Sequence, residues 1–251
     1  MLALERRQHV LDTLRRDRSV VVTDLARRFG VTEETVRRDL QKLEKEGLVS
    51  RTHGGAVAPE AEAEDLPYLT RQTTNSEAKR RIAVHAAHLL PHGAAVMLDS
   101  SSTAFEVLPR LKHHRDLTLI TNSVRIIAHS GITDHAILSV GGELRRRSMT
   151  FVGPVARQAI GQFNADFALI SCKALSQRGG VMDASVADAE IKRAFIAGAQ
   201  RVCLLVDGDK FDGSALTEVC SFAPIHTVIT DRAPSESWRR FLADCEVEVI
   251  Y

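Results

Sequence analysis

Residues 20–55 decide the fold of the N-terminal part and read VVVTDLARRFGVTEETVRRDLQKLEKEGLVSRTHGG. The pattern predicts two short helices joined by a tight turn. Thr23 and Thr32 are placed to cap the two helices, and Gly30 ends the first because glycine adopts the left-handed conformation without steric cost. Apolar residues of the second helix recur at spacings that line one face, as Val36, Leu40 and Leu43. The stretch after Gly47 predicts a short hairpin.

These elements, with a helix predicted over residues 3–16, indicate a winged helix-turn-helix. In this motif the second helix enters the major groove of DNA. Small Ala26, turn-forming Gly30 and apolar Val36 lie where two crossing helices need them, which favours this interpretation over a helical hairpin with a solvated basic face. Hydroxyl and basic groups bind base edges and phosphates, so the predicted DNA contacts are Thr23, Thr32, Thr35, Arg37, Arg38, Lys42, Arg51 and His53.

The composition sets limits on the class of protein. The 251 residues carry a formal net charge of only +1, so the whole chain is not a polycation, although residues 1–57 hold 12 Lys and Arg against 9 Asp and Glu. The four cysteines form no CxxC pair or zinc-finger spacing, which favours reduced thiols. The N-terminus lacks the apolar segment of a signal peptide, and no apolar run approaches membrane-spanning length. We therefore expect a cytoplasmic protein.

A second domain follows a change in pattern. Residues 58–74 begin with a stretch rich in Ala, Glu and Pro and predict a linker between a DNA-binding domain (1–57) and an α/β domain (75–251). After a helix that begins at Ser76, short apolar runs alternate with helical stretches, which predicts a buried, mostly parallel sheet. These runs are AAVML (94–98), LTLI (117–120), AILSV (136–140), FALIS (167–171), VCLLV (202–206), TVIT (227–230) and VEVI (247–250).

Polar residues follow the predicted strands, at the end of the sheet where ligands bind in such folds. The first strand runs into Asp99-Ser100-Ser101-Ser102-Thr103 and then a helix, an arrangement that suits an anion. Such a loop can also be a mere helix cap. Lys210, after another strand, and Lys79, on the preceding helix, could meet the same anion. Together they favour a phosphate site.

The sequence TVRRDL at 35–40, followed by LEKEGLVSRTHGGA at 43–56, resembles the DeoR family of bacterial transcriptional regulators. The resemblance implies a winged helix-turn-helix joined to a Rossmann-like sensor domain that is similar to ribose-5-phosphate isomerase. TNS at 121–123, GGELR at 141–145 and DGDKF at 207–211 match family positions in the second domain. The family loop usually has glycine where this chain has Ser101.

The resemblance also implies an effector site for a phosphorylated sugar. We expect its residues to be Lys79, Asp99, Ser100, Ser101, Ser102, Thr103, Thr121, Asn122, Gly141, Gly142, Lys173, Glu190, Asp207 and Lys210, with Asp166 nearby. Alternatively, Lys173 is a surface loop residue, and Glu190 and Lys192 are surface charges of a helix. His85 and His88 have no carboxylate partner at helical spacing, so we predict no metal and no cofactor.

The leading hypothesis is a repressor of a carbohydrate-use operon that binds double-stranded operator DNA and responds to a phosphorylated sugar. We expect no enzymatic activity and a homo-oligomer assembled through the C-terminal domain, because operators commonly pair half-sites with protein symmetry. One alternative is a sugar-phosphate isomerase with an accessory DNA-binding module, in which a carboxylate acts as base. A pure DNA-organising protein would leave the polar strand ends unexplained.

Overall fold

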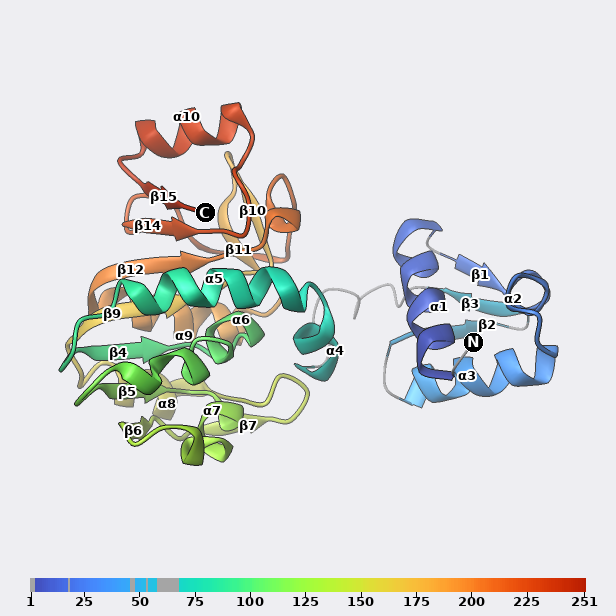
Figure 1. Ribbon diagram of the computed structural model, residues 1–251, viewed down its shortest axis with the longest axis horizontal. Coiled ribbons are helices and arrows are strands. Elements are labelled where there is room, and N and C mark those ends of the chain that lie inside the picture. The colour runs from blue at the N-terminus through green and yellow to red at the C-terminus, as the bar shows by residue number, and fades with distance from the viewer. Residues whose placement is uncertain (1–2, 18, 46–47, 53, 58–67) are drawn as a thin grey trace. The chain divides into compact units, whose positions relative to one another are not determined.

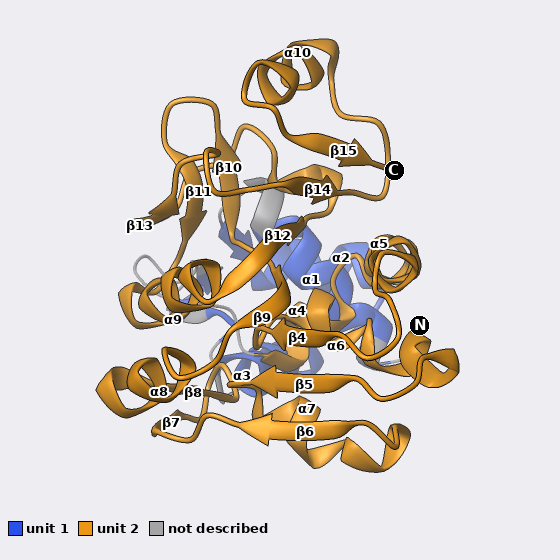
Figure 2. Cartoon of the chain, turned by 90° about the vertical axis from the view of Figure 1, so that its left-hand side faces the viewer, with its two compact units in different colours: residues 1–67 blue, residues 68–251 orange. Residues whose placement is uncertain are grey.

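The computed structural model describes residues 3–17, 19–45, 48–52, 54–57 and 68–251 (Figure 1). The chain divides into two compact units, residues 1–67 and 68–251, which Figure 2 colours separately. No helix in these described ranges is long and apolar enough to cross a membrane.

The N-terminal unit packs three helices against a small antiparallel sheet of order β1-β3-β2. Its elements are α1 (Ala3–Asp17), β1 (Ser19–Val21), α2 (Val22–Phe29), α3 (Glu33–Lys45), β2 (Ser50–Thr52) and β3 (Gly55–Val57). Gly30 ends α2 in the left-handed conformation, with φ 65°, as predicted. Apolar side chains from all three helices form the core, including Val10, Leu25, Val36, Leu40 and Leu43.

Two details of this unit differ from the sequence-based prediction. The cap residue of α2 is Val21, so Thr23 lies inside the first turn and forms no cap hydrogen bond. The chain before α2 is extended because β1 pairs with β3, with Val20 opposite Ala56, and this adds a third strand to the predicted hairpin. Thr32 does cap α3, since its Oγ1 accepts from the Thr35 amide at 3.3 Å.

The C-terminal unit is built on a seven-stranded sheet of order β15-β14-β12-β9-β4-β5-β6. All neighbouring strands in it are parallel. Each strand coincides with one of the seven apolar runs, so the predicted α/β class is confirmed. The strands are β4 (Ala95–Leu98), β5 (Thr118–Thr121), β6 (Ala136–Ser139), β9 (Ala165–Ile170), β12 (Ala199–Leu205), β14 (Thr227–Ile229) and β15 (Glu248–Ile250).

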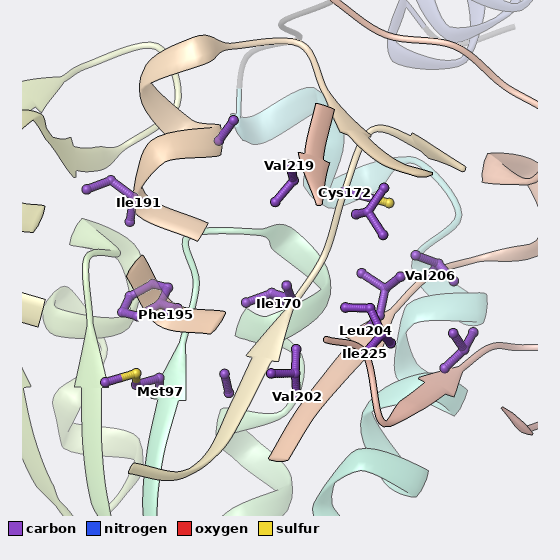
Figure 3. Close-up of a cluster of buried hydrophobic side chains, with 14 of the residues drawn as sticks. Met97, Ile170, Cys172, Ile191, Phe195, Val202, Leu204, Val206, Val219 and Ile225 are labelled. Carbon is purple, nitrogen blue, oxygen red and sulfur yellow. The ribbon is translucent and has the colours of Figure 1, made fainter. Parts of the chain in front are cut away.

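Helices cover both faces of this sheet (Figures 1 and 2). Successive strand residues point to opposite faces: Leu98 packs in the cluster that contains Ile82 of α5, whereas Met97 packs in the cluster that contains Phe195 of α9. Figure 3 shows the second cluster, in which Ile170 and Leu204 of the central strands lie. The helices are α5 (Ser76–His88), α6 (Ser102–Phe105), α7 (Val124–Ala128), α8 (Gly153–Ile160), α9 (Val186–Ala197) and α10 (Glu236–Asp244).

Several short elements surround this framework. An antiparallel sheet has the order β10-β11-β13, and β7 pairs with β8. These strands are β7 (Glu143–Arg145), β8 (Thr150–Val152), β10 (Ala174–Ser176), β11 (Gly180–Asp183) and β13 (Thr217–Cys220), with 3-10 turns η1 (Leu108–His113), η2 (Ser130–Ile132) and η3 (Gly208–Lys210). Each is too short for its periodicity to stand out in the sequence.

The C-terminal unit begins at Tyr68, inside the segment expected to be a linker. Residues 68–73 form a short helix, α4 (Tyr68–Thr73). Tyr68 is 2% exposed, and its ring meets Phe105 edge to face with centroids 6.4 Å apart. The backbone amide of Tyr68 donates to the Arg147 carbonyl at 3.0 Å. Burial of this aromatic side chain therefore orders a segment whose composition predicts little burial.

Candidate nucleic-acid interface and effector site

The strand order reverses between β4 and β9. From β4 the chain proceeds to β5 and β6 on one side, and from β9 to β12, β14 and β15 on the other. In open parallel sheets, ligands bind outside the carboxyl ends of the strands at such a switch point. Asp99 follows β4, Ser171 follows β9, and Asp207 with Lys210 follows β12. The fold thus brings the predicted strand-end residues to one edge of the sheet.

Asp99 ties the two strands at the switch point together. Its Oδ1 accepts from the Ser101 amide and its Oδ2 from the Ser171 amide, both at 2.9 Å. The residue is 1% exposed. Asp99 therefore fixes the shape of the site rather than presenting a free carboxylate to solvent.

The loop after β4 is held mainly by its own hydrogen bonds. Ser101 caps α6, because its Oγ accepts from the Ala104 amide at 3.0 Å. The Ser102 hydroxyl donates to the Arg71 carbonyl at 3.2 Å. Ser101 has φ −70°, an extended conformation open to any residue, so serine replaces the family glycine without backbone strain. The predicted helix is only four residues long; Thr103 is buried within it and Ser100 is buried two residues before it.

Two lysines from different elements stand at this edge. Lys210 Nζ donates to the Ser171 hydroxyl at 2.9 Å and to the Cys172 carbonyl at 2.7 Å. Lys79 Nζ donates to the carbonyls of Arg71 and Thr74. Burial, reinforced by the charge of Lys210, lowers the pKa of Lys79 from 10.5 to about 8. Asp207 links the two elements, because Lys210 lies 4.0 Å from it and Asn75, whose carbonyl accepts from the Lys79 amide, donates to it at 3.0 Å. Two cations on this side of the sheet favour a bound anion.

A second charged cluster lies beside Asp99. Lys192 Nζ pairs with Asp183 Oδ2 and lies 3.5 Å from Asp99 Oδ2. Burial alone would lower the pKa of Lys192, but Asp183 and Asp99 outweigh it and raise that pKa above its usual value. Burial opposes ionisation of Asp183 too, yet Lys192 holds the pKa of Asp183 below its usual range. Both groups stay charged near neutral pH.

The same cluster extends to the beginning of α9. Arg145 Nη1 donates to Asp188 Oδ2 at 2.6 Å and also to the Ser185 hydroxyl. Burial raises the pKa of Asp188 despite the positive charges of Lys192 and Arg145. Sequence reasoning missed Asp183, Asp188, Arg145 and Ser171, and it treated Lys192 as a possible surface charge. Their only sequence signal is that Asp183 and Ser171 follow short apolar stretches.

Other predicted effector residues support the scaffold. Thr121 Oγ1 donates to the Leu98 carbonyl at 2.7 Å, and Asn122 Nδ2 donates to Thr150 Oγ1 at 2.6 Å. Gly142 has φ 110°, and a Cβ there would lie 2.7 Å from the Val152 carbonyl oxygen, so only glycine fits. Gly141 precedes it, Asp207 caps η3, and the Lys173 amide donates to the Met182 carbonyl at 2.9 Å.

Glu190 and Asp166 lie away from this edge, contrary to expectation. Glu190 pairs with Arg157 of α8 at 3.8 Å and lines a groove with Gly161 and Gly198, which precede β9 and β12. Asp166 Oδ2 accepts from the Ala95 amide at 2.8 Å, where β4 begins. The Asp166 contact belongs to the amino end of the sheet. Glu190 lies between Asp188 and Lys192 on α9, but its side chain pairs with Arg157 of α8 rather than with the cluster that holds Asp99 and Arg145.

In the N-terminal unit, basic side chains gather on the exposed side of α3. Arg37 pairs with Glu33 at 2.6 Å and Arg38 with Glu34 at 3.2 Å, and their side chains are 50% and 77% exposed. Asp39 is instead buried and accepts from Arg6 Nε at 2.5 Å, which fixes α3 to α1.

Further predicted DNA contacts lie on the same unit. Lys42, Thr23 and Thr32 are exposed and Thr35 is half-buried, while Arg51 of β2 lies 3.7 Å from Glu44. His53 falls outside the described residues. Among the residues that the structure describes, no group of three or more His, Cys, Asp or Glu could hold a metal ion.

Comparison with known proteins assigns both units. Residues 6–62 match a family model described as the DeoR-like helix-turn-helix domain, and residues 74–232 match one described as the DeoR C terminal sensor domain. Among solved structures, ribose 5-phosphate isomerase A from Methanocaldococcus jannaschii matches with a TM-score of 0.40 and 14% identity, over 55% of each chain.

Curated relatives match along almost the whole chain. An uncharacterised HTH-type transcriptional regulator, YulB of Bacillus subtilis, is 32% identical over 99% of this chain and 96% of its own length. The glycerol-3-phosphate regulon repressor of Escherichia coli is 29% identical over 99% of both chains. The transcriptional repressor AccR of Agrobacterium fabrum is 33% identical over 90% of this chain and 89% of its own. The protein is therefore a DNA-binding transcriptional regulator and belongs to the DeoR family.

Proposed function

We propose that this regulator represses a carbohydrate-use operon and that a phosphorylated sugar controls it from the carboxyl ends of β4, β9 and β12. The observation that carries the proposal is the meeting of Lys79 and Lys210 at the switch point. Among the described residues, Lys79 forms no ion pair, and Lys210 lies 4.0 Å from its nearest carboxylate, that of Asp207. Similar proteins named for a glycerol-3-phosphate regulon and an aga operon support a sugar-derived effector.

The contacts of these lysines suit exchange for a phosphate. Both ammonium groups now donate to neutral acceptors, namely backbone carbonyls and the Ser171 hydroxyl. A phosphate ester is a dianion near neutral pH, so it would give each ammonium group an oppositely charged acceptor in place of a neutral one. A bound phosphate would also relieve the repulsion that contributes to the lowered pKa of Lys79.

The DNA-binding half of the proposal rests on α3. The pairs Arg37–Glu33 and Arg38–Glu34 join exposed side chains four residues apart, and such pairs contribute only about 0.3–0.5 kcal/mol. The guanidinium groups can therefore leave these glutamates at little cost and bind phosphates or guanine edges. Thr35, Lys42 and Arg51 extend this surface, and we propose it as the operator contact.

We propose that the chain regulates without catalysing isomerisation. The carboxylates that the isomerase alternative would use as bases have other partners: Asp166 accepts from the Ala95 amide, and Glu190 pairs with Arg157. We further propose a cytoplasmic homo-oligomer joined through the C-terminal unit, because one winged helix reads only one half-site of a symmetric operator.

The proposal is tested by operator binding in the presence of candidate effectors. An operator is first selected from a random duplex library, and fluorescence anisotropy then measures its affinity with and without glycerol 3-phosphate, ribose 5-phosphate and fructose 6-phosphate. We expect at least one of these esters to change operator affinity by about fivefold or more, with the ester recovered unchanged. Conversion of an ester to its isomer, with no change in operator affinity, would favour the isomerase.

A further inference from the structure

The acidic cluster beside the lysines contains an acceptor that the proposed phosphate contact does not use. Arg145, Ser185 and Asp188 are joined by hydrogen bonds from the guanidinium group, and Lys192 links the cluster to Asp99. Lys210 donates to the Ser171 hydroxyl, and Asp99, which lies 3.5 Å from Lys192, accepts from the Ser171 amide, so the cluster and Lys210 flank the same strand end. The polar edge of the sheet thus has a basic half and an acidic half.

One oxygen in the acidic half has no donor. Asp188 is only 9% exposed, and its Oδ1 is buried without a hydrogen-bond partner, while Oδ2 receives Arg145. Leaving a buried acceptor unpaired costs about 1–3 kcal/mol, and such atoms are rare in native proteins. At the edge of a ligand site, an unpaired buried carboxylate oxygen points to a donor that the ligand brings.

The surrounding charges define that donor. A carboxylate only accepts hydrogen bonds, so the ligand group must carry N–H or O–H. Arg145 lies 2.6 Å from the other oxygen of Asp188, and Lys192 acts on the same carboxylate, so a cationic amine would be repelled. A neutral hydroxyl meets no such repulsion.

We propose that Asp188 Oδ1 accepts a hydrogen bond from a hydroxyl of the effector and so selects among phosphorylated sugars. This inference rests on the proposed function and deepens it. All candidate effectors share the phosphate, which the lysines bind. They differ in the hydroxyl-bearing part, and Asp188 contacts that part. A site built to bond a hydroxyl discriminates strongly against ligands that lack it.

Isothermal titration of the full-length protein tests the assignment. The ligands are fructose 6-phosphate, ribose 5-phosphate, glycerol 3-phosphate and methyl phosphate, an ester without hydroxyls. Asp188→Ala should weaken binding of the best sugar phosphate by about tenfold or more, because a hydrogen bond to a charged group is lost. Methyl phosphate should bind within about twofold of wild type, since only the phosphate contact remains in use.

Glu190→Ala is the matched control, because it removes the same charge from the same helix but at the Arg157 pair. If Asp188→Ala does not fold, Asp188→Asn replaces it in the experiment, because asparagine still offers Arg145 an acceptor oxygen. Asp188→Asn should also weaken sugar-phosphate binding. Equal affinity in wild type and both Asp188 variants would overturn the inference, as would an equal loss in Glu190→Ala. Loss of methyl phosphate binding in Lys210→Ala separately supports the phosphate contact. If no ester binds wild type, proposal and inference both fail.

A second observation concerns residues 68–75, here the coupling segment. The Arg71 carbonyl accepts from both Lys79 Nζ and Ser102 Oγ, and the Thr74 carbonyl accepts from Lys79 at 2.5 Å. Asn75 Nδ2 donates to Asp207 Oδ1 and Asp209 Oδ2, each at 3.0 Å. The segment is thus bonded to the residues proposed to hold the phosphate, and it directly follows the residues that lead from the DNA-binding unit.

We infer that the coupling segment passes the effector signal towards the DNA-binding unit. A phosphate that accepts from Lys79 and Ser102 competes with the carbonyls of Arg71 and Thr74 for the same donors. The effector therefore binds better to the arrangement in which these carbonyls have given up their donors than to the one in which the segment is held by them. This difference in affinity allows effector binding to shift the protein from one arrangement to the other. This inference also rests on the proposed function, but on contacts that Asp188 does not share.

Hydrogen exchange on the full-length protein tests this coupling. The best-binding ester should change exchange of the amides of residues 69–75 by about threefold or more, while those of α10 remain unchanged. Tyr68→Ala, which removes the buried anchor of the segment, should reduce the effector-induced change in operator affinity. Tyr68→Phe should not, since it keeps the buried ring that meets Phe105 edge to face. Bound ester with unchanged exchange, or an unchanged operator response in Tyr68→Ala, would overturn the inference.

Discussion

The ion pairs of α3 and those at the switch point of the sheet differ in how exposed they are and in how far apart their partners lie in the sequence. On α3, Arg37 and Glu33 are 50% and 44% exposed and lie one turn apart on the same helix. At the switch point, Lys192 and Asp183 are 10% and 13% exposed and come from different elements. The exposed pair costs little to exchange, whereas the buried pair is costly to break. One surface is suited to changing partners on DNA, and the other to holding a fixed frame around a ligand.

Breaking the buried pair should have a large effect on stability. Lys192→Ala leaves the carboxylates of Asp183 and Asp99 buried without their cation, which should lower the free energy of unfolding of the C-terminal unit by about 3–5 kcal/mol. Urea denaturation followed by tryptophan fluorescence measures this, because Trp238 is buried in that unit. Arg37→Ala should cost the N-terminal unit less than about 0.5 kcal/mol, measured by circular dichroism because the only tryptophan lies in the other unit. If Lys192→Ala lowers the free energy of unfolding by less than about 1 kcal/mol, the proposed difference between the buried and the exposed ion pairs is wrong.

The same α3 pairs should matter for DNA rather than for folding. Arg37→Ala or Arg38→Ala should weaken operator binding by about 1–3 kcal/mol if the residue contacts a base, and should then relax specificity at one position. A phosphate contact would instead weaken all sequences and reduce the salt dependence. Fluorescence anisotropy at several salt concentrations distinguishes the two. Operator affinity that is unchanged in both variants contradicts the docking of α3.

Two threonines sharpen the comparison within the N-terminal unit. Thr32 caps α3 and Thr23 does not cap α2, although both precede acidic residues at a predicted helix start. Thr32→Ala should therefore destabilise this unit by about 1 kcal/mol, the usual cost of losing a cap, and Thr23→Ala should have little effect. Thermal unfolding followed by circular dichroism provides the comparison. Equal effects in the two variants would mean that the cap assignment is wrong.

The pH dependence of effector binding should report on Lys79. Its pKa of about 8 means that the ammonium form predominates below pH 8 and is lost as the pH rises above it. Affinity for a phosphate dianion should therefore fall by about twofold between pH 7 and pH 8 and continue to fall above. Lys79→Arg stays charged over this range and should remove the dependence. Titration calorimetry between pH 7 and pH 9 measures the affinity of both proteins. If affinity falls equally with pH in wild type and Lys79→Arg, Lys79 is not the group responsible for the pH dependence.

Much of this framework could be predicted from the sequence because its signals are local. The inner strands of the main sheet are largely buried on both faces and so appear as continuous apolar runs. The rule that ligands bind at strand ends predicted that Asp99 and Lys210 lie at one edge of the sheet, and the structure has both there. The strands of the small sheets have three or four residues each, too few to show a period. Tyr68 orders α4 through a contact with Phe105 that no local pattern encodes.

The acidic half of the proposed site was harder to predict from the sequence, for a physical reason. Lys192, Asp188 and Glu190 lie on one helix and are equally polar in the sequence. Only tertiary packing turns the first two towards Asp99 and Arg145 and leaves Glu190 beside Arg157. Charged residues are rarely buried unless paired, so their partners, which lie far away in the sequence, decide which charges face inward.

Lys210→Ala tests the central claim most directly. Lys210 is proposed to bind the phosphate of the effector, so the variant should bind the best sugar phosphate about tenfold or more weakly, as expected for loss of a charge-assisted hydrogen bond. Ligand-free operator affinity should be unchanged, and the operator response to the effector should disappear. Isothermal titration paired with anisotropy measures both. Wild-type affinity for the sugar phosphate in Lys210→Ala would contradict the proposed site.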